Sequence, residues 1–178
     1  MDRDREGMLE MTPPEEHGHD EAIPSLDALG ITLPPYRPLP SSLPFETHVR
    51  DGTILYLSGH ISDIDGEPQL RGQLGGELSV EEGREAARSV MRNLLATLQH
   101  AAGGLRNVAA VLRLLGMVNS APGFTDQPGV VNAASEMLVA ALGRQRGVHA
   151  RSAIGVAQLP FGVPVEIELT VRLRKEPT

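Results

Sequence analysis

The chain has no cysteine and no tryptophan, and aromatic side chains make up only 3% of its 178 residues. Without cysteine there can be no disulfide, no thiolate nucleophile and no cysteine-ligated zinc. The scarcity of aromatic rings leaves little surface on which nucleic-acid bases could stack. The hydrophobic fraction of 40% must therefore come mainly from Ala, Val and Leu, and we expect an aliphatic core.

Clustered basic charge is also missing. Lys and Arg number 16 against 23 Asp and Glu, which gives a net charge of -7. Because phosphate binding depends on grouped basic side chains, we expect no nucleic-acid partner. No run approaches the roughly 20 apolar residues of a membrane span, and the N-terminus lacks an apolar signal segment. These absences predict a cytoplasmic protein without membrane contact.

Residues 1–24 are predicted to form a disordered acidic tail, because they contain few large apolar side chains to offset the entropy of ordering. His17 and His19, beside Glu15, Glu16 and Asp20, could capture a divalent metal, but a solvated tail is the simpler interpretation and no metal site is predicted. Residues 25–178 are predicted to form a single domain.

The domain is expected to open with a proline-rich arm over residues 25–44. Such a segment favours extended backbone. It could serve as a ligand for the aromatic-lined groove of another protein, but packing against its own domain is the more economical interpretation.

The pattern that follows predicts a β-hairpin and then a helix. Asp51-Gly52 supplies the backbone angles of a tight turn between strands at residues 45–50 and 53–59. Ser79 and Glu82 have the spacing of a capping box, which predicts a helix start, and the glycines at 103 and 104 predict its end.

The second half of the chain predicts a strand over residues 108–118 and a second helix over about 128–143. Residues 165–173 alternate between apolar and polar side chains, which is typical of a strand with one buried face. The order of elements predicts an α+β fold in which two helices cover one face of a mixed β-sheet. The other face must meet water or another subunit.

The candidate chemical centre lies in residues 150–168. Arg151 opens an otherwise apolar strand, and the next strand carries Glu166 and Glu168. A planar guanidinium can bind a carboxylate through two parallel hydrogen bonds. Alternatively, Arg151 forms a structural salt bridge with Glu166 or Glu168 on the neighbouring strand.

Four stretches resemble the reactive-intermediate deaminase family (RidA or YjgF-like proteins), formerly called L-PSP endoribonucleases. They are Leu57-Ser58-Gly59-His60, Val80-Glu81-Glu82, Val131-Asn132-Ala133, and Ala150-Arg151-Ser152-Ala153 continuing to Val165-Glu166-Ile167-Glu168. The similarity covers about residues 26–174. Residues 29–34 and 118–128 resemble a less-characterised branch of the family.

The resemblance implies a chorismate-mutase-like protomer of the bacillus type. It further implies a homotrimer whose sheets form a central barrel, with ligand clefts between neighbouring subunits. The best-known members hydrolyse 2-imino acids to 2-keto acids and ammonia without a cofactor. The implied ligand is therefore a small carboxylate or imino acid.

By position, the resemblance implies that Arg151 holds the substrate carboxylate and that Glu166 orients or activates water. The other residues expected to shape the cleft are Phe45, Ser58, Gly59, Asn132 and Ala153. His60 follows the family glycine and could line the cleft, but an exposed histidine near a strand end is the simpler expectation.

Phe45 stands where many members carry tyrosine, and Ala153 stands where many carry cysteine. These differences favour an alternative function, a non-catalytic trimer that binds a small carboxylate metabolite as a sensor. The historical ribonuclease activity is a third hypothesis, which the acidic charge and the few aromatic side chains disfavour.

Overall fold

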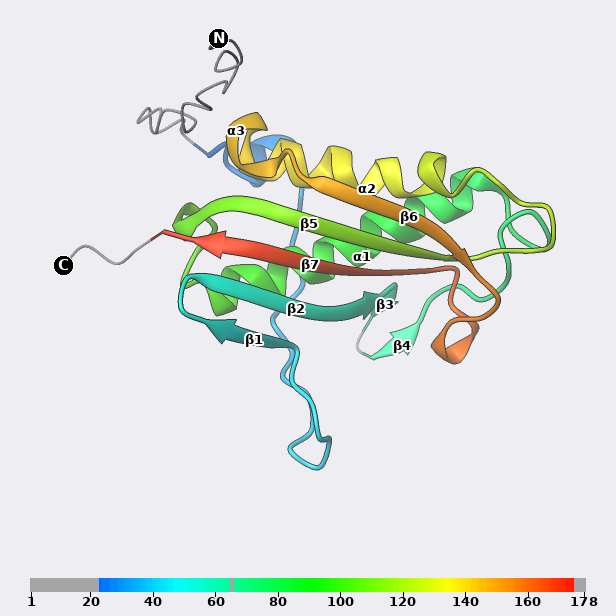
Figure 1. Cartoon of the computed structure of the whole chain (residues 1–178), viewed down its shortest axis with the longest axis horizontal. Helices are drawn as coiled ribbons and strands as arrows, with labels where there is room; N and C mark the ends of the chain where they lie inside the picture. Colours follow the sequence, from blue (N-terminus) through cyan, green and yellow to red (C-terminus); the bar gives the residue numbers. More distant parts are fainter. Residues whose placement is uncertain (1–22, 65, 175–178) are drawn as a thin grey trace, which may run out of the picture.

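The computed structural model describes residues 23–64 and 66–174, and these form a mixed β-sheet with helices on one face (Figure 1). The sheet has five strands in the order β1-β2-β7-β5-β6, and only β5 and β6 run parallel. The strands are β1 (His48–Asp51), β2 (Ile54–Ile61), β5 (Val108–Asn119), β6 (Ala150–Val156) and β7 (Val165–Leu173). Beside them lies a short hairpin of β3 (Asp63–Ile64) and β4 (Glu67–Pro68). The predicted α+β fold is confirmed.

The first helix, α1 (Val80–Ala101), begins where the sequence predicts. The Ser79 backbone N–H donates to Glu82 Oε2 at 2.8 Å, and the Glu82 N–H donates to Ser79 Oγ at 3.3 Å. The capping box therefore satisfies backbone donors that the first helical turn leaves free.

The second helix, α2 (Gln127–Leu142), is followed directly by the short helix α3 (Arg144–Gly147). The Gly129 N–H donates to Asp126 Oδ1 at 3.2 Å, which caps the start of α2. Gly143, with φ of +76°, ends it at the predicted glycine.

The hairpin turn differs from the prediction by one residue. Asp51 pairs with Ile54, so the loop consists of Gly52 and Thr53 rather than Asp51 and Gly52. Of the two loop residues, only Gly52 has a positive φ, +57°, and it takes the first loop position. The first strand also starts at His48, which leaves Phe45 in the preceding loop.

The core lies between the sheet and the helices α1 and α2 (Figure 1). The predicted inward face of β7 is confirmed, because its alternate apolar side chains are all buried: Val165, Ile167, Leu169, Val171 and Leu173. No described helix covers the opposite face. There the intervening residues of β7, such as Glu166 and Glu168, are partly accessible.

The proline-rich arm packs on its own domain. Ile31 is buried, and Leu26 and Leu33 pack partly buried against the same core. Residues 1–22, which make up most of the predicted acidic tail and include the alternative metal ligands His17 and His19, lie outside the described residues. In the described part of the chain, no helix has the length and apolar character that crossing a membrane requires.

Candidate functional site

Glu166 lies on the uncovered face of the sheet, near the start of β7. It is in register with Met117 of β5 on one side and Ile61 of β2 on the other. The pairing of β2 with β7 is shifted between Leu57 and His60, which is a β-bulge that contains Gly59. A Cβ at position 59 would overlap the Glu166 carboxylate. Glycine at this position therefore makes room for the Glu166 side chain.

The environment of Glu166 makes its carboxylate more basic. Burial raises its pKa above the usual range, and the charge of nearby Glu168 adds to the effect. A carboxylate with a raised pKa is a better proton acceptor than an ordinary surface glutamate. Glu166 is still partly accessible, so a substrate or water molecule can reach it.

The backbone on either side of Gly59 is fixed by hydrogen bonds. Ser58 Oγ donates to the Glu46 carbonyl at 2.6 Å, and the Ser58 N–H donates to the Thr47 carbonyl at 3.0 Å. His60 Nδ1 lies 2.8 Å from the Ser58 carbonyl, which can only accept, so Nδ1 carries a proton. The serine hydroxyl is thus occupied by the backbone.

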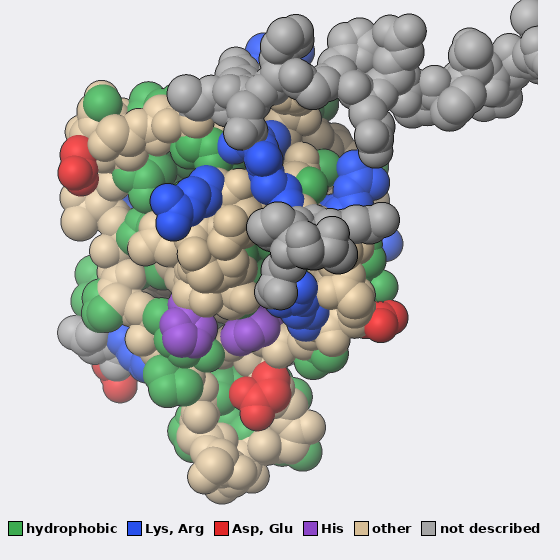
Figure 2. All heavy atoms as spheres, turned by 90° about the vertical axis from the view of Figure 1, so that its left-hand side faces the viewer, with side chains coloured by type: hydrophobic (Ala, Val, Ile, Leu, Met, Phe, Trp, Pro, Cys, Tyr) green, Lys and Arg blue, Asp and Glu red, His purple; other side chains and the backbone are tan. Residues whose placement is uncertain are grey.

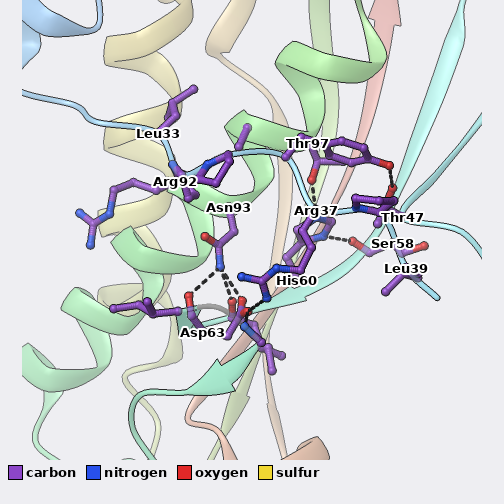
Figure 3. A pocket seen from close by; sticks show the side chains of 18 of the residues that line it. Leu33, Arg37, Leu39, Thr47, Ser58, His60, Asp63, Arg92, Asn93 and Thr97 are labelled. Atoms are coloured by element: carbon purple, nitrogen blue, oxygen red, sulfur yellow. Dashed lines mark hydrogen bonds and ion pairs between the residues drawn. The ribbon is translucent and has the colours of Figure 1, made fainter.

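His60 is not the exposed strand-end residue that the sequence suggested. Its Nε2 lies 2.8 Å from Thr97 Oγ1 on α1, so the ring connects the sheet to the helix (Figure 3). Burial lowers the pKa of His60 and favours the neutral ring. With Nδ1 protonated, Nε2 accepts the Thr97 hydroxyl proton.

Arg151 lies at the start of β6, in register with the fully buried Leu114 of β5. Neighbouring side chains in register point to the same face of a sheet, so Arg151 is on the face that the helices cover. Its guanidinium donates from Nη1 to Asn132 Oδ1 at 2.8 Å on α2. The structure therefore brings Arg151 and Asn132 together, as the sequence predicts. The Arg151 side chain itself is exposed.

Ser135 also holds Arg151 and in turn contacts His149, and the sequence did not point to either residue. Arg151 Nη1 also donates to Ser135 Oγ at 3.2 Å, one helical turn after Asn132. Ser135 Oγ lies 3.2 Å from His149 Nε2, and His149 Nδ1 lies 2.6 Å from the Gly147 carbonyl. The spacing of three residues between Asn132 and Ser135 is the sequence signal that could have found this contact.

Ala153 lies two residues after Arg151 on β6 and is in register with Gly116 of β5. It therefore shares the face of Arg151 and forms part of the same region, partly buried against the core. Neither position carries more than a methyl group, so little side-chain volume projects from the sheet there.

The predicted site residues thus form two groups on opposite faces of the sheet. Glu166 and Gly59 lie on the uncovered face at β2 and β7, whereas Arg151 and Asn132 lie at the edge formed by β6 and α2. The alternative of a salt bridge from Arg151 to Glu166 or Glu168 is wrong. β5 separates β6 from β7, and the side chains point away from each other.

A cavity of about 730 Å³ adjoins the first group. Phe45, Ser58 and Gly59 contribute to its lining, together with the arm and α1 (Figure 3). Phe45, with 55% of its surface exposed, stands at this cavity rather than beside Glu166. Within residues 23–64 and 66–174, no three His, Asp or Glu side chains converge as metal ligands.

Comparison with known proteins places this architecture in a family. The model of the family described as endoribonuclease L-PSP matches residues 37–173. Protein TCP17 of Trypanosoma cruzi is 40% identical over 149 residues, which cover 84% of this chain and 92% of TCP17.

Solved structures agree with that match. The protein Atu1372 of Agrobacterium tumefaciens, of unknown function, is 34% identical with a TM-score of 0.75, over 84% of this chain and 91% of that chain. A Shewanella oneidensis protein is 28% identical with a TM-score of 0.76, over 83% of this chain and 96% of its own. The chain belongs to the endoribonuclease L-PSP family, also known as the RidA or YjgF family.

Proposed function

We propose that the protein is a cofactor-independent imine deaminase whose site is completed by a second copy of the chain. The observation that carries the proposal is the Glu166 carboxylate, which is held against Gly59 and has a raised pKa. It is a positioned base on an accessible sheet face. Among the described residues, no cation is in register with Glu166 on the neighbouring strands, and Arg151 of the same chain points to the other face.

Assembly of several copies would supply that cation. The uncovered sheet face carries exposed apolar side chains, with Tyr56 50% exposed and Ile154 43% exposed, which favours burial against another subunit. The family resemblance implies a homotrimer with a chorismate-mutase-like barrel. In this proposal Arg151 and Asn132 of one subunit face Glu166 and Gly59 of the next.

The chemistry follows from these groups. The Arg151 guanidinium binds the carboxylate of a 2-imino acid and fixes its C=N carbon. Glu166 takes a proton from a water molecule as the water oxygen bonds to that carbon. Glu166 then returns that proton to nitrogen, which gives a carbinolamine. Glu166 next carries the hydroxyl proton to the nitrogen, the C–N bond breaks as the C=O bond forms, and a 2-keto acid and ammonia leave.

A coupled assay tests the proposal. An amino-acid oxidase generates the 2-imino acid, and the release of ammonia is followed with and without the protein. We expect faster release with the wild type and a loss on the order of 100-fold in kcat/KM for Arg151→Ala, because the cation that binds the substrate carboxylate is removed. An unchanged rate with the wild type would reject the deaminase.

A second function, a non-catalytic binder of a small carboxylate metabolite, is favoured by Phe45 and Ala153. Neither side chain can donate a proton or a hydrogen bond. Calorimetry with a 2-keto acid distinguishes the two functions, because the sensor would bind it through Arg151 without accelerating imine hydrolysis. RNA cleavage has less support, since the protein has few aromatic side chains and a net charge of -7.

A further inference from the structure

The arm creates a compartment beside the candidate site. β1 pairs with β2 only from Ile54 to Leu57, so the segment from Ser58 to Ile61 has no described strand on that side. The arm residues 32–40 lie across this gap and, with α1, enclose the cavity of about 730 Å³ (Figure 3). Ligand pockets in proteins commonly measure about 300–1,000 Å³. The cavity therefore has the size of a binding compartment rather than of a packing defect.

The arm is attached to the domain at two points, so the walls of the compartment are in place before a ligand binds. The Tyr36 ring stacks on His100 with centroids 3.8 Å apart, and its hydroxyl lies 3.1 Å from Thr47 Oγ1. Histidine side chains gather on the end of the molecule seen in Figure 2, and His48 lies edge to face with His100 at 6.4 Å. Preformed walls lower the entropy cost of binding a ligand.

The second attachment is an ion pair. Arg37 Nη1 lies 3.2 Å from Asp63 Oδ2, next to the start of the β3–β4 hairpin (Figure 3). Asp63 Oδ1 also accepts from Asn93 Nδ2 of α1 at 2.7 Å. The arm, the hairpin and α1 are thus connected at one carboxylate.

The lining of the compartment suits an apolar group. The arm contributes Leu33, Leu39 and four prolines, and Phe45 and Ile64 add further apolar surface. Several polar groups of the lining are already paired: His60 with Thr97, Asn93 with Asp63, and Arg92 with Glu85 at 3.1 Å. A polar or charged ligand group would have to displace these partners, whereas an apolar one would not.

Gly59 connects the compartment to the proposed chemistry. It lines the cavity, and a Cβ at this position would overlap the Glu166 carboxylate. Gly59 has no side chain that would separate a substrate beside Glu166 from the cavity. A methyl group would leave this volume almost empty.

We infer that the compartment holds the side chain of the substrate, and that the protein prefers 2-imino acids with a large apolar side chain, aromatic or branched. This inference rests on the proposed function for the position of the imine carbon. Burial of a side chain of this size favours binding by about tenfold or more over a methyl group. The arm is then the element that determines specificity.

Equilibrium binding tests the inference without requiring turnover. We expect calorimetry to show that phenylpyruvate binds at least about tenfold more tightly than pyruvate. Ser89 lines the compartment from α1, and Ser89→Phe should remove most of that preference by filling the space. Ser41→Phe, at an exposed position outside the lining, is the matched control and should keep the preference.

A second variant tests the compartment independently, in case Ser89→Phe does not fold. Leu39→Ala removes apolar wall from the arm without adding bulk, and it should weaken phenylpyruvate binding several-fold with less effect on pyruvate. Equal affinity of the wild type for the two keto acids would overturn the inference, as would an unchanged preference in both variants.

Measuring turnover of two imino acids distinguishes a failure of this inference from a failure of the proposed function. Hydrolysis of imino acids from alanine and phenylalanine with equal kcat/KM would overturn the compartment and leave the deaminase standing. A preference for phenylpyruvate without turnover of either imino acid would support the compartment and reject the deaminase.

Discussion

The Glu166 carboxylate occupies the space that a side chain at position 59 would need, so Gly59 and Glu166 are matched across β2 and β7. The β-bulge that contains Gly59 sets this contact. Catalysis in the proposed mechanism depends on where the carboxylate lies, and hence on the absence of a side chain at position 59.

Gly59→Ala is therefore expected to displace Glu166. Imine hydrolysis should fall by at least about tenfold in kcat/KM, because a shift on the order of 1 Å at a catalytic group is costly. Gly76→Ala is the matched control, since a Cβ there meets its nearest atom at an ordinary 3.4 Å and φ is not positive. Steady-state kinetics of both variants make the comparison, and equal rates in Gly59→Ala and the wild type would contradict the role of Glu166.

The raised pKa of Glu166 predicts a pH dependence of both rate and stability. The unprotonated base is the active form, so kcat/KM should rise with pH through a pKa above the usual glutamate range. In the folded state the proton is bound more tightly than in the unfolded state. The charged carboxylate therefore costs stability once the pH exceeds the folded-state pKa.

Glu166→Gln should consequently raise the free energy of unfolding at pH 7.5 relative to the wild type, and the difference should shrink at pH 4. Urea denaturation at the two pH values measures it. A variant less stable than the wild type at pH 7.5 would show that Glu166 is a structural residue instead.

His60 predicts a pH dependence of the opposite sense. Its pKa is lowered mainly by burial, so the unfolded chain binds a proton more readily than the folded protein does. The stability that the neutral ring contributes is present above the unfolded-state pKa of about 6.5 and is lost as the pH falls below it. Wild-type protein should lose more stability than His60→Gln between pH 7.5 and pH 5. Parallel losses in denaturant titrations would argue against a buried neutral His60.

Ser135 is predicted to position Arg151 rather than to touch the substrate. Ser135→Ala removes one of the two hydrogen bonds that orient the guanidinium, so KM should rise several-fold with little change in kcat. Ala140→Ser, at an exposed position of α2, is the control. A fall in kcat at constant KM would instead place Ser135 in the chemical step.

Much of the fold is predictable because its signals are local. Ser79 and Glu82 determine the start of α1 through two hydrogen bonds within four residues. The alternation along β7 determines which side chains are buried, whatever the strand's neighbours are.

The arrangement of the site is not local, and the sequence could not give it. β6 follows α2 and pairs parallel to β5, which places it away from β7 although the two are consecutive strands. The register with β5 then decides the faces, because Arg151 pairs with Leu114 and Glu166 pairs with Met117. The role of His60 likewise depends on Thr97, which is 37 residues away in the chain.

Mixed assembly tests the central claim, that one site uses Arg151 of one chain and Glu166 of another. Arg151→Ala and Glu166→Gln chains with different tags are co-expressed, and complexes that carry both tags are purified. In the proposed trimer, every complex that carries both tags has one interface in three that combines an intact Arg151 with an intact Glu166. We therefore predict about a third of the wild-type rate, although each variant alone is nearly inactive. A mixed complex no more active than the separate variants would contradict a shared site.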